Sequence, residues 1–514
     1  MRLDLKEKRR VKSLKSDVLI IGAGGAGLVA AIYAKEQGVN VKVLTKEYPT
    51  RSQTCMAQGG INAALGNVSE DSIEDHIANT LKSAHSQADE EAVRFMCSEA
   101  IETVHWLESI GVCFSRTKEG KIAQRTLGGA SAPRACYAQD YTGLKILHTL
   151  YDKALSLGIE IENEKFLLEL LQDKDAKVSG VLMLDIRSGE VQKYEANSVI
   201  LATGGYSRIY DKNSTNSTAS TGDGIAAALR VGAKLIDMEF VQFHPTALKN
   251  SSILISESAR GEGGYLLNSK GERFTNELAP RDEVSRAIHK EILKGEDIFL
   301  DIRHLGEEFI EEGLPQERKL AKLYEDIDPV HQLIPIKPVA HYTMGGIEVN
   351  NKSQTSVSGL FACGECANHR VHGANRLGGN SLLEIVVFGK EAGINAAKMA
   401  KNSSEVEEKE TLLQKLQHYT NEIDFYEKKQ FLGDLLYKKV GIVRKKDELQ
   451  EVLEEIQLLK SQLPSMGVSD DSKIYNTNLL EFIEFHNILD VAEVVVASAL
   501  KRHESCGAHF MEEL

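Results

Sequence analysis

Side chains that could bind and protonate a small anion gather between residues 244 and 376. Each has a structural alternative, because a histidine before proline can cap a turn and an arginine in "PRDEVSRAI" can neutralise neighbouring acids. Together they place cationic and donor groups beside glycine-rich segments, and charge-assisted hydrogen bonds at both ends are what a small dicarboxylate requires. The residues with this chemistry are His244, Ser256, Glu257, Arg260, Arg281, His341 and Arg376.

A glycine motif near the N-terminus predicts a nucleotide site. "VLIIG" is typical of a buried parallel strand, "LVAAIYAKEQG" of a helix and "VKVLTK" of the next strand. Gly22, Gly24 and Gly27 between them let the backbone approach a pyrophosphate at a helix N-terminus. Glycines placed only for packing are the alternative. The acidic residue that often binds the ribose is replaced by Thr45 and Lys46, so this motif alone does not identify the nucleotide.

The elements that must position these groups recur far along the chain. Strand, glycine turn and helix follow one another again in "SVILATGG" (198–205) with "STGDGIAAALRVG", and in "GLFACGECA" (359–367) with "GGNSLLEIVVFGKEAGINAA". One nucleotide domain built from such distant segments implies an insertion between them. We therefore expect an α/β fold with a discontinuous, Rossmann-like nucleotide-binding domain (1–243 and 344–402), an inserted α+β capping domain (244–343) and a C-terminal helical domain (403–514).

Composition restricts the function class. The 514 residues carry 61 Lys and Arg against 75 Asp and Glu, a net charge of −14 that argues against nucleic acid as a partner. No apolar run reaches the ~18 residues of a membrane span, and the basic "KEKRRVKSLK" lacks the apolar region of a signal peptide. We expect a solvated tail there. The charge runs after residue 403 are typical of solvated helix faces, and some could equally dock a partner.

The cysteines favour free thiols. There are seven, an odd number scattered over the chain, which is typical of a reducing compartment. Cys363 and Cys366 form the only C-x-x-C, and a zinc site would need a second pair, so no metal is expected. A redox disulfide and two plain thiols at a strand–turn junction are the remaining alternatives.

At this point a family resemblance is plain. The segments "AQGGINAALGN", "RTLGGASAPRACYAQDYTGLKILHTLYDKAL", "FVQFHPTAL", "RGEGGYLLN", "AHYTMGG" and "HGANRLGGNSLLE" resemble the flavoprotein subunit of succinate dehydrogenase and fumarate reductase, from about residue 16 onward. L-aspartate oxidase, of the same superfamily, shares "HPTAL", "RGEG" and "LAPRD". The stretches "RTLGGASAPRACYAQDYTG" and "LDIRHLGEEFIEEGLPQ" resemble the succinate/fumarate branch more closely.

The resemblance implies roles for individual residues. His244, Ser256, His341 and Arg376 would hold the two carboxylates of fumarate or succinate, with Ser256 where the family more often has threonine. Arg281 would donate the proton to fumarate, and Glu257 and Arg260 would relay protons to it. The residues implied for FAD are Gly22, Gly24, Gly27, Thr45, Lys46, Ser52, Gln53, Gln58, Gly59, Gly60, Asp223, Glu365, Ser381 and Leu382.

The proton relay also has a physical rationale. As hydride reaches one alkene carbon of fumarate from flavin N5, polarisation of the bound carboxylate favours charge at the other carbon, where a proton must arrive. An arginine desolvated among other cations and bonded to Glu257 could transfer a proton that it immediately regains. Glu257 and Arg260 are three residues apart, which places them on one face of a helical turn.

Gln53 departs from the family. A histidine at this place bonds covalently to the flavin in many members, whereas an amide is not a nucleophile, so we expect non-covalent FAD. A lower flavin potential would then favour fumarate reduction. The alternative is a thioether from Cys55, which would lie on the same side as Gln53 if the segment is extended.

Further departures concern partner docking. His85 stands in place of an acid and Cys506 in place of an arginine, and the family's C-terminal extension is not seen, so docking to an iron–sulfur subunit could differ. We expect a cytoplasmic protein held at the inner face of the membrane through partner subunits. L-aspartate oxidase and a flavin-binding electron carrier without turnover remain alternatives; the latter would be expected to lack Arg281 or His341, which are both present.

Overall fold

The structure of the protein is a computed structural model that describes residues 14–400, 416 and 418–512. Most of the basic segment "KEKRRVKSLK" and most of the charged run 405–419, for which helix was predicted, lie outside the described residues.

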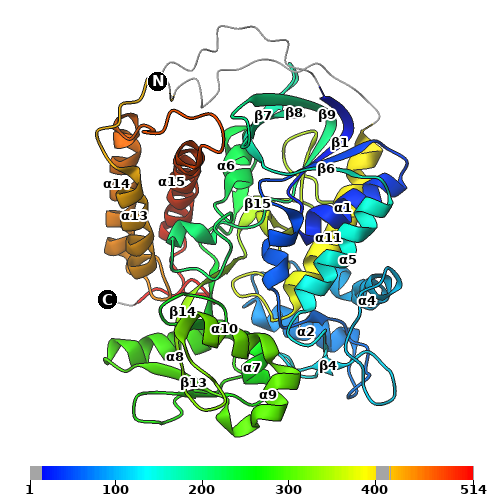
Figure 1. Cartoon of the computed structure of the whole chain (residues 1–514), viewed down its shortest axis with the longest axis vertical. Helices are drawn as coiled ribbons and strands as arrows, with labels where there is room; N and C mark the ends of the chain where they lie inside the picture. The colour runs from blue at the N-terminus through cyan, green and yellow to red at the C-terminus, as the bar shows by residue number, and fades with distance from the viewer. Residues whose placement is uncertain (1–13, 401–415, 417, 513–514) are drawn as a thin grey trace.

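A seven-stranded sheet forms the centre of the upper half of Figure 1. Its order is β6-β2-β1-β9-β8-β7, with β16 also paired to β9. The strands β6, β2, β1, β9 and β16 run parallel, and β8 pairs antiparallel with both of its neighbours, β9 and β7. This confirms the predicted Rossmann-like α/β fold. The strands are β1 (Leu14–Ile21), β2 (Val41–Leu44), β6 (Glu160–Glu162), β7 (Lys165–Gln172), β8 (Val178–Asp185), β9 (Val191–Leu201) and β16 (Leu360–Ala362).

The two faces of this sheet are buried in different cores because strand side chains alternate. Val18 and Ile20 of β1 face a core shared with helices on one side, whereas Leu19 and Ile21 face the C-terminal helices. The helices of the first side are α1 (Gly25–Glu36), α2 (Ile73–Ser83), α3 (Glu90–Ser98), α4 (Ala100–Ser109), α5 (Thr142–Ser156) and α11 (Asn380–Met399). The second side carries α6 (Asp223–Arg230), α13 (Phe425–Lys439), α14 (Lys446–Gln462) and α15 (Thr477–Lys501).

The β1–α1 turn needs its glycines for two reasons. Gly22 has a φ of +107°, and a Cβ there would lie 2.2 Å from the carbonyl oxygen of Ala202. A Cβ on Gly27 would lie 2.0 Å from the carbonyl oxygen of Gly22. Gly27 therefore serves the close packing of helix on turn, and Gly22 the turn itself.

A second sheet, which is antiparallel, lies at the bottom of Figure 1 and has its own core around Leu248, Ile288 and Ile336. We call residues 244–343 the capping segment. The strand order of this sheet is β11-β14-β13-β12. Strand β11 begins at Val241, three residues before the domain boundary predicted from the sequence. The elements are β11 (Val241–Leu248), α7 (Glu257–Gly261), β12 (Tyr265–Leu267), α8 (Arg281–Leu293), β13 (Ile298–Asp301), α9 (Glu307–Gly313), α10 (Pro315–Glu325) and β14 (Ile334–Thr343).

Short elements complete the fold around the site. The paired strands are β3 (Ile61–Asn62), β4 (Gln124–Arg125) and β5 (Ala135–Cys136), and β10 (Leu235–Ile236), β15 (Gly346–Glu348) and β17 (Ala367–Asn368). The 3-10 turns are η1 (Pro49–Arg51), η2 (Gln53–Met56), η3 (Ser207–Tyr210), η4 (Arg303–Leu305), η5 (Gly364–Cys366) and η6 (Leu463–Ser465).

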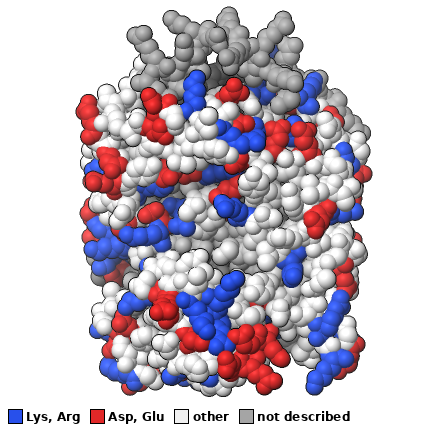
Figure 2. All heavy atoms as spheres, in the orientation of Figure 1, with Lys and Arg blue, Asp and Glu red and all other residues white. Residues whose placement is uncertain are grey.

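The surface adds little specific information. Acidic and basic side chains are interspersed over the face in Figure 2. Among the described helices, none is both long enough and apolar enough to cross a membrane.

Candidate active site

One large cavity runs from the β1–α1 turn to the capping segment. It contains about 1610 Å³ of space without atoms, part of it open to solvent, against roughly 300–1,000 Å³ for an ordinary small-molecule site. A dinucleotide together with a small substrate fits that size. All the site residues predicted from the sequence line this cavity except Gly27, which packs behind the turn, and Arg260, which lies behind Glu257.

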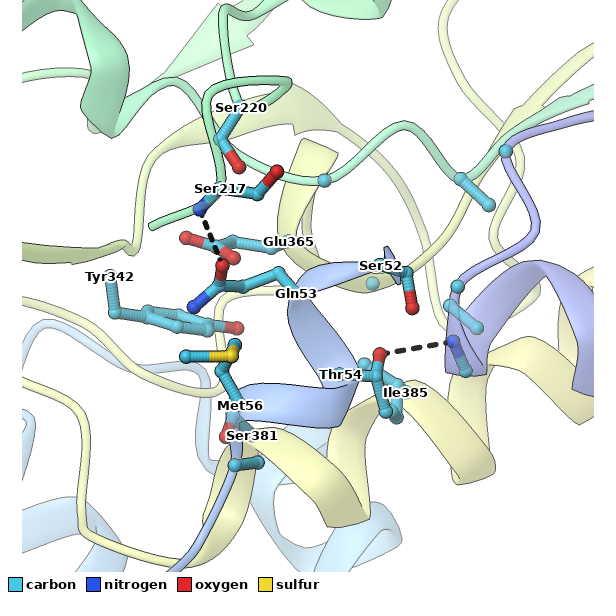
Figure 3. Close-up of a pocket in the computed structure, with 18 of the residues that line it drawn as sticks. Ser52, Gln53, Thr54, Met56, Ser217, Ser220, Tyr342, Glu365, Ser381 and Ile385 are labelled. Atoms are coloured by element: carbon cyan, nitrogen blue, oxygen red, sulfur yellow. Dashed lines mark hydrogen bonds between the residues drawn. The ribbon is translucent and has the colours of Figure 1, made fainter. Parts of the chain in front are cut away.

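The loop that carries Gln53 forms one wall (Figure 3). Oε1 of Gln53 accepts a hydrogen bond of 2.7 Å from the backbone N–H of Ser217, and Oγ1 of Thr54 accepts one of 3.1 Å from that of Gly25. The segment is a 3-10 turn rather than extended, which corrects the premise under which Cys55 would face the flavin with Gln53. The Cys55 thiol donates to the carbonyl of Thr50 at 3.1 Å, and Cys55 does not line the cavity.

Unpaired polar atoms along the wall fit a polar cofactor. Both side-chain polar atoms of Gln58, Oγ of Ser52 and Oγ1 of Thr203 are buried without a hydrogen-bond partner among the described residues. Buried polar groups are rarely left unpaired in native proteins, so these atoms indicate the position of a ligand with several hydrogen-bonding groups. With the glycine turn, this donor and acceptor set fits FAD.

Lys46 and Asp223, which both line the cavity, are also paired with each other and with residues of α15. Nζ of Lys46 lies 2.9 Å from Oδ2 of Asp223 and 2.5 Å from Oε1 of Glu484 on α15. The other oxygen of Asp223 accepts a hydrogen bond of 2.8 Å from Asn487. Sequence reasoning missed Glu484 and Asn487, because they lie more than 250 positions away on a helix with no motif.

Glu365 is a buried carboxyl beside the cavity. It accepts hydrogen bonds from the backbone N–H of Thr343 at 2.9 Å and from its hydroxyl at 3.2 Å. Burial raises the pKa of Glu365 to about 7, so the group is poised to be neutral or charged near neutral pH.

At the capping end, two histidines face each other from β11 and β14. The ring centroids of His244 and His341 are 4.8 Å apart. Burial, followed by the charge of Arg281, lowers the pKa of both well below the usual value, so both rings are neutral. Nδ1 of His244 accepts from the backbone N–H of Thr246 at 3.2 Å, so its proton must be on Nε2, which can then donate to a carboxylate.

Arg281, Glu257 and Arg260 form a buried chain. Nε and Nη2 of Arg281 donate to Oε2 of Glu257 at 2.9 and 2.5 Å, and Nη2 of Arg260 lies 3.7 Å from Oε1 of Glu257. Burial alone would raise the pKa of Glu257, but the two arginines hold it below its usual value. Gly128 donates its N–H to Oε1 at 2.8 Å, and a Cβ at Gly128 would lie 2.2 Å from that oxygen.

Gln242 is another site residue that sequence reasoning missed. Its Oε1 accepts from Nη1 of Arg281 at 2.9 Å and from Nη2 of Arg376 at 3.2 Å, and its Nε2 donates to Asn375 and to the carbonyl of Arg376. It does not line the cavity. No local motif marks Gln242, because its arginine partners lie 39 and 134 positions away.

Arg376 lies above an aromatic ring. Its guanidinium carbon is 4.4 Å from the centroid of Tyr342, whose hydroxyl donates to Glu384 at 2.5 Å. Nε2 of His372 lies 3.0 Å from the same carboxylate oxygen. Burial, then the charge of Arg281, lowers the pKa of Arg376 to about 10, where it remains cationic at neutral pH.

The two other departures, His85 and Cys506, meet in space. The Cys506 thiol approaches the carbonyl of His85 at 3.8 Å, and Nε2 of His85 lies 3.2 Å from Oδ2 of Asp282. Cys363 and Cys366 are buried free thiols at the junction of β16 and η5. No group of three potential metal ligands occurs among the described residues.

Comparisons with known proteins show the family of the chain. The family described as "FAD binding domain" matches residues 17–382, and "Fumarate reductase flavoprotein C-term" matches residues 429–514. The succinate dehydrogenase flavoprotein subunit of Rickettsia bellii is 40% identical, over 97% of this chain and 90% of its own. The 8-methylmenaquinol:fumarate reductase flavoprotein subunit of Wolinella succinogenes is 39% identical, over 97% and 86%.

Among solved structures, a variant of the E. coli quinol fumarate reductase flavoprotein superposes with a TM-score of 0.92 at 36% identity, covering 98% of this chain and 92% of that one. The glycine turn, the unpaired polar wall and the histidine–arginine end of the cavity thus occur in a chain that matches these proteins along nearly its whole length. The chain belongs to the family of flavoprotein subunits of succinate dehydrogenase and fumarate reductase, which are FAD-dependent oxidoreductases.

Proposed function

We propose that this protein interconverts fumarate and succinate as the catalytic flavoprotein subunit of a fumarate reductase or succinate dehydrogenase, with fumarate reduction favoured. The observation that carries the proposal is the capping end of the cavity, where Arg281 and Arg376 lie beside two neutral histidines with Glu257 as the nearest acid. FAD, when bound along the glycine turn and the 52–60 loop, supplies hydride transfer at N5.

His244, Ser256, His341 and Arg376 bind the two carboxylates in this proposal. Ser256 accepts hydrogen bonds on Oγ from the N–H of Ser258 at 3.1 Å and from its hydroxyl at 2.8 Å. Its own hydroxyl proton is therefore free to be donated to a substrate carboxylate. Nε2 of neutral His244 donates in the same way, and Arg376 supplies the charge.

Arg281 delivers the proton. Two of its nitrogens bond to Glu257, so a proton given to the substrate carbon is replaced through that carboxylate, with Arg260 behind it. The three side chains are almost fully buried, which keeps bulk water from competing as the acid. For succinate oxidation, the same groups accept the proton in reverse.

The cofactor is held without a covalent bond in this proposal. Gln53 offers an amide whose oxygen is occupied by Ser217, and burial raises the pKa of the Cys55 thiol to about 11, so it stays a protonated thiol. Trichloroacetic acid should release the FAD quantitatively to the supernatant. A yellow pellet that still fluoresces after washing would contradict this.

Partner subunits complete the reaction. The chain has no redox centre besides FAD in this proposal, so an iron–sulfur subunit would pass electrons to it, and a membrane anchor would hold both at the inner face of the membrane. Co-purification of the native complex from cells tests this part separately.

The activity is tested with dithionite-reduced benzyl viologen as electron donor. The FAD-loaded wild type should oxidise it only when fumarate is added, with succinate as product. Arg281→Gln should lower kcat by about 10²–10⁴-fold, because the proton donor is lost. Arg303→Gln, an exposed arginine of the capping segment bonded to Asp301, is the matched control and should match the wild type. Fumarate without effect on the wild type, or equal rates for Arg281→Gln, would overturn the proposal.

A further inference from the structure

A buried acid outside the cavity supports the substrate end of the site. Glu317, the third residue of α10, is 0% exposed and does not line the cavity. Its Oε1 accepts a hydrogen bond of 3.0 Å from the backbone N–H of Ser256. Ser256 is the N-cap of α7, so this bond fixes both the proposed substrate hydroxyl and the first residue of that helix, Glu257.

The start of α10 is held in turn by another part of the chain. The residue in the N-cap position, Leu314, has no side-chain oxygen to accept from the first N–H groups of the helix. Oδ2 of Asp140 takes that place, accepting from Gln316 at 2.7 Å and from Glu317 at 3.3 Å. Asp140 precedes α5, which packs beside α1 on the main sheet, whereas α10 belongs to the capping segment.

Several polar atoms in this place have no hydrogen-bond partner among the described residues. They are Oε2 of Glu317, Oδ1 of Asp140, and Nε and Nη1 of Arg125 on β4. The side chains are buried, and the charges of Asp140 and Arg125 act on Glu317. The charge of Arg125 thus acts on two buried carboxyls, those of Asp140 and Glu317. If both acids were ionised, one buried negative charge would be left without compensation.

We propose, on the basis of the function proposed above, that Glu317 is a positioning residue that aligns Ser256 and Glu257 for the dicarboxylate. Glu317 does so only when Asp140 docks the capping segment onto the main sheet. The chain Asp140, α10, Glu317, Ser256 then transmits closure of the capping segment to the substrate hydroxyl. A substrate carboxylate that bonds to Ser256 favours the closed arrangement by the same contacts.

A proton is part of this arrangement. Burial, then the charge of Asp140, raises the pKa of Glu317 well above its usual value, and burial raises that of Asp140. The other titratable groups facing the pair are Arg125, Tyr141 and, 3.9 Å from Arg125, Glu262. Neutral Glu317 accepts from Ser256 without repelling Asp140. Loss of that proton at alkaline pH would set two carboxylates against each other and loosen the bond.

The test measures binding of malonate, a dicarboxylate that cannot be oxidised to an alkene, to the FAD-loaded full chain by calorimetry. Glu317→Ala leaves the Ser256 amide unpaired and should weaken malonate about ten-fold or more. Glu317→Gln keeps a carbonyl acceptor and cannot ionise, so near pH 7 its Kd should stay within about two-fold of the wild type. As the pH is raised from neutrality until the Glu317 carboxyl ionises, the wild type should lose at least about three-fold more affinity than Glu317→Gln.

Glu325→Gln is the matched control. Glu325 ends the same helix, and its Oε1 also accepts from backbone N–H groups, of Asn250 at 3.0 Å and Ser251 at 3.2 Å. This variant should follow the wild type at every pH. Malonate binding by a folded Glu317→Ala that equals the wild type would overturn the inference, and so would equal alkaline weakening in Glu317→Gln. If Glu317→Ala does not fold, the inference is tested by comparing the pH dependence of malonate affinity between the wild type and Glu317→Gln. A wild type that neither binds malonate nor reduces fumarate would instead overturn the proposed function.

Discussion

A single amide oxygen, Oε1 of Gln242, accepts hydrogen bonds from both arginines of the proposed site. The charges of Arg281 and Arg376 repel each other. The neutral side-chain carbonyl of Gln242 bonds to both guanidinium groups and fixes their positions without cancelling their charge. In the proposed function, the substrate carboxylate binds to this positive charge. The pKa of Arg376 is lowered in part by the charge of Arg281, as expected for two close cations.

Gln242→Glu should therefore harm catalysis although it preserves shape. A carboxylate would neutralise the two arginines, make Arg281 a weaker acid and repel a bound dicarboxylate. We expect kcat/KM for fumarate to fall on the order of one-hundred-fold, measured by steady-state viologen oxidation. Gln87→Glu is the control, because Gln87 also accepts from an arginine, Arg502 at 3.3 Å, but is exposed. Equal loss in both variants, or none in Gln242→Glu, would contradict this role.

At this scale, the sequence predicts residues that belong to local motifs and misses those whose role comes from tertiary contacts. Gly22 could be found because a turn between strand and helix needs a positive φ within a few residues. Gln242 and Glu317 could not, because their partners lie more than 35 and 60 positions away and nothing in their neighbours marks them. The roles implied for Arg281 and Ser256 remain predictions, although the structure places both at the cavity.

At the scale of elements, the end of α2 is tied to the start of α8. His85 approaches Asp282 at 3.2 Å, and Arg286 bonds to the same carboxylate at 2.7 Å. The hydrogen bond to Asp282 raises the pKa of His85 above its usual value. His85 stands with a φ of +50°, so its backbone is held in a conformation that side chains rarely adopt.

This pair predicts a pH-dependent stability. Because the folded pKa of His85 is raised, its contribution is fully present below about pH 6.5 and is lost as the pH rises through the folded value. His85→Ala should lower Tm by only about 1 °C at about pH 6, because His85 is partly exposed and the buried Asp282 keeps its bond to Arg286. This gap should close as the pH rises above the folded pKa of His85. Differential scanning calorimetry measures both. His148→Ala, at an exposed histidine, should show no such trend; a gap that is constant with pH would contradict the ion pair.

The elements themselves were largely predictable. The parallel strands before each glycine turn follow from short apolar runs, and β1 and α1 form where the pattern predicts them. The 3-10 turn at Gln53–Met56 was not predictable, because four residues carry no periodicity that distinguishes it from an extended loop. That turn decides where Cys55 points.

Across the whole molecule, the C-terminal helix α15 contacts residues at the nucleotide end of the cavity. Glu484 and Asn487 on α15 hold Lys46 and Asp223, which themselves line the cavity. The pKa of Lys46 is kept high by Asp223 and Glu484 in spite of its burial. The cofactor site is therefore assembled from both ends of the chain, and FAD should stabilise α15 as well as the main sheet.

Glu484→Ala should weaken FAD. Removal of one partner leaves the buried Lys46 with incomplete compensation, and we expect the Kd of FAD to rise about ten-fold or more, measured by fluorescence quenching on titration of the apoprotein. Glu481→Ala, one turn away with a distant ion pair to Lys429 at 3.7 Å, should leave the Kd unchanged. An unchanged Kd in Glu484→Ala would show that α15 does not support the nucleotide end.

The most direct test of the central claim mixes chemically reduced, FAD-loaded protein with fumarate in a stopped-flow instrument, without any mediator. The account predicts rapid reoxidation of the flavin with one succinate formed per FAD, and a rate lower by about 10²–10⁴-fold in Arg281→Gln at unchanged FAD content. Reduced wild-type protein that is indifferent to fumarate, or an Arg281→Gln variant that reoxidises as fast as the wild type, would contradict it.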